Sequence, residues 1–329
     1  MGFQDSRYLH QEVKGLIKFQ MEMTEENSMK IKHCPNKSCE YHKNPIPKFY
    51  YKHGSYTTKR GIRTERFKCR GCGKTFAENI NDNTYGQQKP DINRMLFHML
   101  CSGMTLRRIA RTLEVCPKTV QRRIDWLTPY CMERHVAFLE AVGDQLHWVQ
   151  FDEMETCEST KLKPLSIPLI IHPKTQKILG FDVAAIGAKG HLAKTYNEVY
   201  QYPRINETRE SFNRLFEFIT RYCKNIKIIM TDQKPAYIKV VEKYFPEAEH
   251  VAILSRKKAE KKITEATAKE ERETKEGKDK MFILNHFCAR LRADIAALRR
   301  RTWSVCKKPS NLAQRLLIYT CYTNKTLDY

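Results

Sequence analysis

The sequence has no long apolar run. No stretch of about 18 consecutive apolar residues, the minimum for a helix that crosses a membrane, occurs among its 329 residues. Its first twenty residues, MGFQDSRYLHQEVKGLIKFQ, also lack the apolar segment of a secretory signal peptide. We therefore expect a cytoplasmic protein with no membrane partner.

Acidic side chains are too few to balance the basic ones. The chain has 59 Lys and Arg against 37 Asp and Glu, which gives a formal net charge of +22. A positive field of this size favours a polyanionic partner. Because the chain offers no membrane segment, nucleic acid is the favoured polyanion. The length also predicts two or three domains, since domains usually contain about 100–150 residues.

Disulfides are not expected, although the chain has 12 cysteines. A protein without an export signal stays in a reducing compartment, where disulfides are rare. Eight cysteines are scattered singly, and such residues usually act as small core side chains. The other four form two close pairs: Cys34, Cys39, Cys69 and Cys72.

The two cysteine pairs predict a zinc ribbon over residues 31–80. Four thiolates on two hairpins suit a closed, structural zinc site, and Gly71 and Gly73 supply the permissive backbone that such a turn needs. The alternative is four unpaired structural cysteines. Three histidines could also replace a ligand: His33, His42 and His53. Between the pairs, alternating aromatic and basic residues predict strands that either lie against phosphates or form a solvated surface.

A helix-turn-helix is predicted within a helical region over residues 88–142. Residues 102–127, SGMTLRRIARTLEVCPKTVQRRIDWL, have the apolar spacing of that motif, and Ala110 is small where the second helix would cross closely. The following helix would present polar and basic side chains to the major groove of DNA. These candidate DNA contacts are Lys118, Thr119, Gln121, Arg122 and Arg123. The alternative is a plain helical pair with a basic outer face.

From residue 147 the pattern changes to runs of strand-forming residues. Five strands are predicted: 147–156, 165–172, 178–186, 226–232 and 250–254. Helical periodicity appears at 207–223 and 236–245, so the order is that of a mixed α/β domain over residues 145–322. Residues 256–280 are dense in both charges and are predicted to be a solvated helix or mobile insertion. A short leading helix is expected within residues 1–30, and a further helix from Met281 to Thr302.

Two aspartates stand at unusual places in these strands. Asp152 lies inside the apolar run WVQFDE, and Asp232 ends the apolar run IKIIMTD. A carboxylate buried in a strand is costly unless a partner or metal compensates it. Glu153 should alternate to the opposite face, whereas Glu155 is a further candidate.

Several segments together resemble bacterial insertion-sequence transposases of the DDE type, in particular those that begin with a zinc ribbon and a helix-turn-helix. They are HGSYTTKRGIRTERFKCRGCGKTF, TLRRIARTLEVCPKTVQRRI, VQFDEMET, IIMTDQ and LNHFCARLRADIAALRRRTW, within roughly residues 34–322. The resemblance implies a ribonuclease-H-like catalytic domain whose first and fourth strands are adjacent. It also implies that the chain binds the ends of an element on double-stranded DNA as a homo-oligomer, near the nucleoid.

By this resemblance Asp152 and Asp232 are the first two catalytic carboxylates, which would hold two Mg²⁺ ions for DNA strand cleavage and strand transfer. The third catalytic position, usually Glu, aligns with Asn285, whose amide oxygen brings no charge. Asp279 is the nearby carboxylate alternative, and Glu276 and Asp294 are further candidates. The closing arginines are additional candidate DNA contacts: Arg299, Arg300 and Arg301.

Two other functions compete with that of an active transposase. A DNA-binding regulator would need only the ribbon and the helix-turn-helix, and Asp152 and Asp232 argue against it. A decayed transposase that binds DNA without cutting it is favoured by the Asn at position 285.

Overall fold

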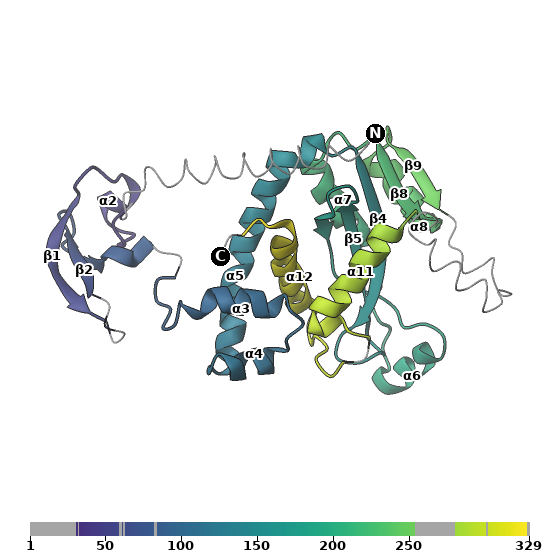
Figure 1. Cartoon of the computed structure of the whole chain (residues 1–329), viewed down its shortest axis with the longest axis horizontal. Coiled ribbons are helices and arrows are strands. Elements are labelled where there is room, and N and C mark those ends of the chain that lie inside the picture. The colour runs from purple at the N-terminus through teal and green to yellow at the C-terminus, as the bar shows by residue number, and fades with distance from the viewer. Residues whose placement is uncertain are drawn as a thin grey trace. The chain divides into compact units, whose positions relative to one another are not determined.

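The computed structural model describes residues 31, 33–58, 61, 63–81, 84–253, 280–300 and 302–327 (Figure 1). The chain divides into two compact units between Asp91 and Ile92. The predicted leading helix and almost all of the predicted charged insertion, residues 256–279, lie outside the described residues.

The first unit is built on a small antiparallel sheet. Its strands follow the order β1 (Tyr50–Thr57), β2 (Arg63–Cys69) and β3 (Thr75–Ala77), and a short helix α2 (Glu40–Lys43) precedes them. The buried residues are few, and half of them are cysteines: Ile31, Cys34, Cys39, Phe49, Cys69 and Phe76. This core is small because β1 exposes almost every side chain.

The second unit opens with three helices, α3 (Ile92–Leu100), α4 (Leu106–Thr112) and α5 (Pro117–Val142). Thr105 caps α4, since its hydroxyl accepts a hydrogen bond from the Arg108 backbone at 3.3 Å. α5 is one continuous helix of 26 residues, about 39 Å long. It unites the last helix of the predicted helix-turn-helix with the helical stretch predicted after it.

A mixed sheet follows, and all five predicted strands are confirmed. They are β4 (Trp148–Cys157), β5 (Pro164–His172), β6 (Lys177–Phe181) with the short β7 (Ala184–Ala185), β8 (Ile228–Asp232) and β9 (Glu249–Ile253). The order across the sheet is β6-β5-β4-β8-β9, with β7 beside β5. The pairs β4/β5 and β5/β6 are antiparallel, whereas β4/β8 and β8/β9 are parallel. The mixed α/β prediction is therefore confirmed.

Helices cover both faces of this sheet. The predicted helices α7 (Thr208–Tyr222) and α8 (Pro235–Tyr244) pack on one face, where Phe151 of β4 meets aromatic rings of both. The other face carries α11 (Phe282–Asp294) and α12 (Pro309–Asn324). Three described α-helices had not been predicted: the short α2, α6 (His191–Tyr200) and α12.

The helix predicted from Met281 to Thr302 is too long. α11 ends at Asp294, Ile295 is extended, and a 3₁₀ turn, η4 (Ala296–Leu298), replaces further α-helix. Arg299 and Arg300 therefore lie beyond the helix on which we had placed them. The two alanines and Leu298 of η4 are buried, so packing at this corner outweighs the helical periodicity.

The predicted boundary near residues 142–145 does not separate two hydrophobic cores. Leu96 of α3 and Ile124 of α5 belong to the same buried cluster as Ile167 of β5 and Leu316 of α12. α12 packs along α5, which ties the helix-turn-helix region to the sheet. The helix-turn-helix region therefore shares one core with the sheet face that carries α11 and α12.

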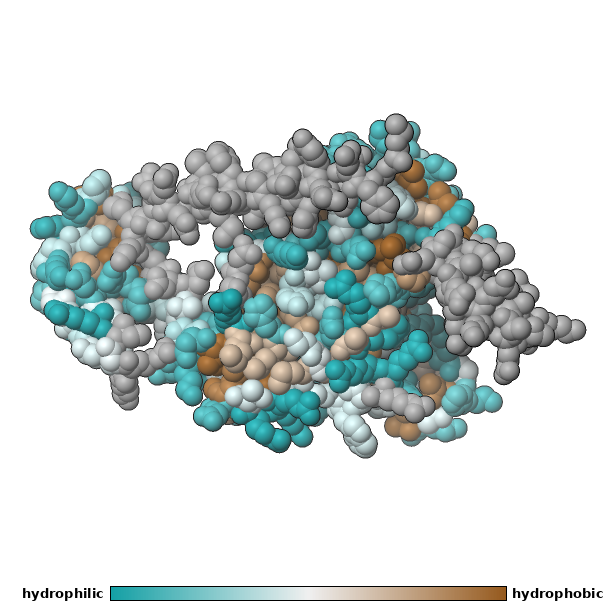
Figure 2. Space-filling view, in the orientation of Figure 1, coloured by the Kyte–Doolittle hydropathy of each residue, from teal (hydrophilic) through white to brown (hydrophobic). Residues whose placement is uncertain are grey.

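The visible surface is mostly hydrophilic, and apolar areas lie over α4 and around α6 (Figure 2). Around α6 the exposed apolar side chains are Val199, Tyr202 and Ile205. None of the described helices is long and apolar enough to cross a membrane.

Candidate functional site

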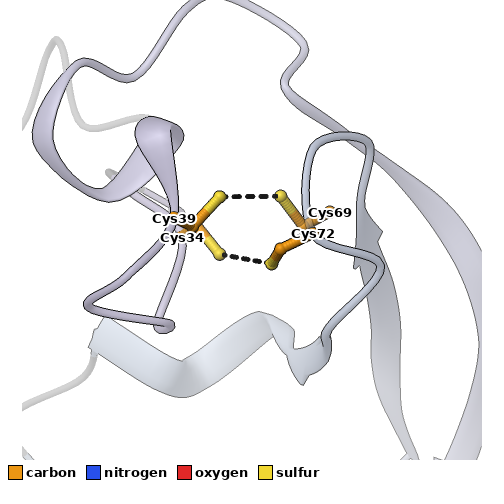
Figure 3. Close-up of side chains that lie close together, drawn as sticks. All are labelled: Cys34, Cys39, Cys69 and Cys72. Atoms are coloured by element: carbon orange, nitrogen blue, oxygen red, sulfur yellow. Dashed lines mark hydrogen bonds between the residues drawn. The ribbon is translucent and has the colours of Figure 1, made fainter.

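The first unit brings the four paired cysteines together. Cys34 and Cys39 flank the turn before α2, and Cys69 and Cys72 belong to the turn between β2 and β3 (Figure 3). The Sγ atoms lie 3.6 Å apart for Cys34 and Cys72, and 3.8 Å apart for Cys39 and Cys69. A tetrahedral zinc site with Zn–S bonds of about 2.3 Å has S–S edges of about 3.8 Å. All four thiols are free, and the cluster could hold a zinc ion.

The electrostatics of the four thiols are unequal. Burial raises the pKa of Cys34 to about 12 and also raises the pKa of Cys39. The pKa of Cys72 is lowered to about 6, because the backbone N–H of Lys74 donates to its sulfur. A bound dication would supply the positive charge that the buried thiolates otherwise lack.

Two glycines and a histidine lie around the cysteine centre. A Cβ at Gly71 would come within 2.9 Å of the Tyr41 ring, and Gly73 has φ +69°, so both positions favour glycine. The His42 Nδ1 atom lies 2.7 Å from the carbonyl oxygen of Cys34. The imidazole therefore braces the backbone of the turn, and the four cysteines make up the ligand cluster.

The second unit places Asp152 and Asp232 on neighbouring parallel strands. Gln150 of β4 is in register with Met230 of β8, and the two aspartates each follow that pair by two residues. Side chains alternate along a strand, so both carboxylates belong to the sheet face that carries α11. The predicted adjacency of these two strands is thus observed.

The pair is electrostatically strained. Burial raises the pKa of Asp152 to about 6, and the negative charge of Asp232 adds to this, while the Tyr237 hydroxyl and Lys234 oppose it. Burial also raises the pKa of Asp232. Both carboxylates would be more easily ionised beside an added cation.

Three hydrogen bonds orient the two carboxylates. The Tyr237 hydroxyl on α8 donates to Asp152 Oδ1 at 3.0 Å, and the backbone N–H of Glu153 donates to the same oxygen at 2.7 Å. The backbone N–H of Lys234 donates to Asp232 Oδ1 at 3.1 Å. The hydrogen-bond donors are therefore a hydroxyl on α8 and the backbone N–H groups one or two residues after each aspartate.

Glu153 and Glu155 are engaged in ion pairs with lysines. Glu153 pairs with Lys234 and accepts a hydrogen bond from the Ser166 hydroxyl at 2.7 Å. Glu155 pairs with Lys189. Both glutamates lie on the strand positions that alternate with Asp152, as predicted for Glu153.

α11 is fastened beside the aspartates by a buried glutamine. The Gln150 side chain donates to the carbonyl of Lys280 at 2.8 Å and accepts from the backbone N–H of Leu284 at 3.1 Å. It thereby satisfies a backbone donor in the first turn of α11. On the same helix, burial and the charge of Asp152 raise the pKa of Cys288 to about 11.

The third acidic position is not completed by the described residues. Asn285 is exposed on α11, one turn before Cys288. Asp294 ends the same helix and accepts a hydrogen bond from the Tyr319 hydroxyl at 2.6 Å. Asp279 and Glu276 lie outside the described residues. In the described part of the chain, the cysteine centre is the only cluster of three or more acidic, His or Cys ligands.

The predicted DNA contacts at the start of α5 fall into two groups. Lys118 and Arg122 are exposed and Thr119 is partly exposed. Gln121 instead donates hydrogen bonds to Asp125 and to Gln314 of α12.

Arg123 was wrongly placed on the outer face, since it is only 8% exposed. α5 packs on both α4 and α12, and no sequence pattern within residues 102–127 reveals the second of these partners.

Arg299 has a bracing role that the sequence did not reveal. Its guanidinium donates to the carbonyl oxygens of Gly103 at 3.0 Å and Ala293 at 3.3 Å. It joins the turn before α4 to the end of α11. Arg300 is exposed, and Arg301 lies outside the described residues.

Sequence reasoning missed three residues of the aspartate site: Gln150, Lys234 and Tyr237. A buried Gln in the run WVQFDE was the one visible signal, because a buried amide needs partners. Tyr237 resembles an ordinary apolar position of an amphipathic helix, and only the packing of α8 reveals its hydroxyl partner.

Comparison with known proteins names no relative for this arrangement. No protein-family model matches the chain, and a search of the curated proteins finds no match. Function must therefore be argued from the two sites themselves.

Proposed function

We propose that the chain is a DDE-type transposase, which binds the ends of an insertion element and catalyses DNA strand cleavage and strand transfer. The observation that carries this proposal is the position of Asp152 and Asp232. Each follows by two residues the paired residues Gln150 and Met230 of the neighbouring parallel strands β4 and β8, and both aspartates are partly buried. No third acidic side chain joins them among the described residues.

The topology of the sheet supports a ribonuclease-H-like domain. Three antiparallel strands, β4 to β6, are extended by the parallel strands β8 and β9, and the first strand lies at the centre. This order agrees with the arrangement that the transposase resemblance implies. α7 and α8 provide the crossovers between the parallel strands.

The oxygen atoms of the aspartate pair fit Mg²⁺, a hard cation that prefers carboxylates and water. Asp152 and Asp232 would hold the ions, and the amide oxygen of Asn285 is the proposed third ligand. When bound, Mg²⁺ activates water or a DNA 3′-hydroxyl and stabilises the leaving oxygen. No protein nucleophile is needed.

The residues around the pair keep its geometry. Tyr237 fixes one oxygen of Asp152 and leaves the other free to bind, while the Lys234 backbone does the same for Asp232. The Lys234 side chain is held away on Glu153, so that its ammonium does not occupy the space between the aspartates.

Recognition of DNA is assigned to the other end of the second unit and to the ribbon. Lys118 and Arg122 at the start of α5 are exposed cations on the helix that would enter the major groove. The ribbon adds exposed aromatic and basic side chains, among them Tyr51 of β1 and Arg70, which follows β2 and lies over the Tyr51 ring. Structural zinc at the four cysteines would hold that sheet.

A decayed transposase is the second candidate, and one observation favours it. Position 285 carries an amide where the family resemblance expects a carboxylate, and no third acidic or His ligand joins the pair among the described residues. Such a chain would bind the element's ends but leave them uncut.

Nicking of a labelled duplex that carries the element's end tests the proposal. The wild-type chain should nick it with Mg²⁺ or Mn²⁺, and Asp152→Asn should bind the duplex equally well without nicking it. Arg122→Ala should weaken binding and lower the slope of log affinity against log salt by about 0.9, because one phosphate contact is lost. Binding without nicking by the wild type would establish the decayed form.

A further inference from the structure

One tryptophan is fully exposed on the second unit. Trp126 packs partly against the hydrophobic core and Trp148 is 37% exposed, whereas Trp303 shows its entire side chain to solvent. A large apolar ring is normally buried or placed at an interface. Among the described residues none covers this ring, which leaves it available to a partner.

Trp303 lies in the loop between η4 and α12, the yellow segment that leads into α12 in Figure 1. A local turn closes around it, because the backbone N–H of Ser304 donates to the Thr302 hydroxyl at 2.9 Å. Farther along, the carbonyl of Cys306 accepts from the backbone N–H of Ser159 at 2.9 Å. These two hydrogen bonds fix the backbone of the loop near Trp303, whose ring is exposed to solvent.

The other anchor connects this loop to the helix-turn-helix. Arg299, four residues before Trp303, donates to the carbonyl of Gly103 in the turn that leads into α4. In a helix-turn-helix the first helix crosses the DNA backbone beside the recognition helix. A ring held from this turn would reach the same duplex.

The charge around the ring identifies the kind of partner. Residues 299–308, RRRTWSVCKK, include five basic side chains and no acidic one. A protein partner that buried this segment would have to compensate every cation. A nucleic-acid strand provides both a phosphate for each cation and a flat base for the indole ring.

We propose that Trp303 stacks on an unpaired DNA base beside the duplex that the α4–α5 helix pair holds. The inference rests on the DNA-binding part of the proposed function and is independent of cleavage. Arg300 and Lys307, both exposed, would contact the flanking phosphates.

Fluorescence of the full-length, zinc-loaded protein tests the contact. With Trp126→Phe and Trp148→Phe, Trp303 is the only tryptophan. Its emission should be quenched as the protein is titrated with a labelled duplex of mixed sequence that carries single-stranded overhangs, in step with the anisotropy of the label, and high salt should reverse both signals. Rising anisotropy with unchanged emission overturns the proposal.

Affinity in the otherwise wild-type chain gives a second measurement. Trp303→Ala should weaken duplex binding by about 5- to 150-fold, the usual range for one lost base–aromatic stack, whereas Trp303→Phe should keep most of the affinity. Tyr202→Ala removes another exposed aromatic side chain from the same unit and should leave binding unchanged. Equal binding by Trp303→Ala and the wild type overturns the proposal.

Two further outcomes separate the alternatives. If Trp303 emission shifts with protein concentration without DNA, and Trp303→Ala lowers the sedimenting mass, the ring joins two copies of the chain and the proposal is wrong. If no duplex is bound at all, both this inference and the proposed function fail. If the protein binds DNA with quenching of its Trp303 emission but never nicks the DNA, this inference stands and the proposed catalytic activity fails.

Discussion

The cysteine centre and the aspartate pair bring like groups together by different means. The four cysteines come from two short turns of one small sheet, and each turn supplies two ligands. The two aspartates are separated in the sequence by the strands β5, β6 and β7 and the helices α6 and α7, and the pairing of β4 with β8 makes them neighbours. A site whose ligands are close in sequence can be complete by itself, whereas a site assembled by strand pairing depends on every element around it.

The two sites also differ in what they contribute to folding. The first unit buries few side chains besides its cysteines, so its stability must depend on a ligand that joins the two turns. The second unit has an extensive hydrophobic core, and the burial of its charged carboxylates lowers the free energy of unfolding. Removal of a ligand residue should therefore destabilise one unit and stabilise the other.

Loss of metal from the cysteine centre should have the largest effect. Purified protein should contain one zinc per chain, and chelation or Cys69→Ser should unfold residues 31–80, because a structural zinc contributes about 10–16 kcal/mol. Limited proteolysis after chelation measures this. Residues 92–253 should stay protected as an internal control, and Cys157→Ser should leave the zinc content unchanged. Less than half an equivalent of zinc in intact protein would contradict the prediction.

Replacement of an aspartate should end DNA cleavage yet stabilise the fold. Because the pKa of folded Asp152 is raised from its usual value to about 6, its contribution to stability is present at acid pH and is lost as pH rises through about 6. At pH 7 Asp152→Asn should therefore raise the free energy of unfolding by about 2 kcal/mol, and below pH 4 the gain should vanish.

Denaturant unfolding at pH 7 and pH 4 measures this difference, and nicking assays measure the lost cleavage. Asp182→Asn is the matched control, because Asp182 forms an ion pair with Arg214 and its replacement should not stabilise the fold. A destabilised Asp152→Asn protein at pH 7 would show that the carboxylate is already compensated in the free chain.

Tyr237→Phe should have an intermediate effect. It removes the hydroxyl that donates to Asp152 and keeps the ring that packs on Phe151. Cleavage should fall by about 10- to 100-fold, as for other residues that orient a metal ligand, with little change in DNA binding. Tyr244→Phe, on the same helix, is the control. The prediction is wrong if both variants nick DNA at the wild-type rate.

Substitution of Asn285 should have the smallest effect, because a neutral amide adds little metal affinity. Asn285→Ala should slow nicking a few-fold, and Asn285→Glu should lower the Mg²⁺ concentration needed for half-maximal nicking. The exposed neighbour His286 gives the control His286→Ala. If neither change at position 285 alters nicking while both aspartates are essential, the third ligand comes from elsewhere in the chain.

Local patterns were enough to predict much of this molecule. The cysteine spacing predicted the four-thiol cluster, because two hairpin turns leave few other arrangements for their sulfurs. The helices α7 and α8 followed from periodicity, because one face of each is buried, and the strands followed from runs of strand-forming residues. The pair of Asp152 and Asp232 was recognised by carboxylates in apolar runs.

The errors arose where a distant element decides the environment. Arg123 is buried on α5, a helix that packs on α4 and on α12, close to the end of the chain. α11 stops at Asp294 because the next residues pack into the corner, against their helical periodicity. Arg299 bonds to Gly103, a residue almost two hundred positions away.

The sequence by itself determined which groups are candidates for chemistry, namely four thiols in two turns, two carboxylates at strand positions and an excess of cations. Only the tertiary structure decided how they are used. It placed Tyr237 and Gln150 around the aspartates, merged the helix-turn-helix with the sheet and left Trp303 exposed on an anchored loop. The physical reason is that hydrogen bonding and burial depend on partners from other elements, whereas periodicity and spacing are properties of a single segment.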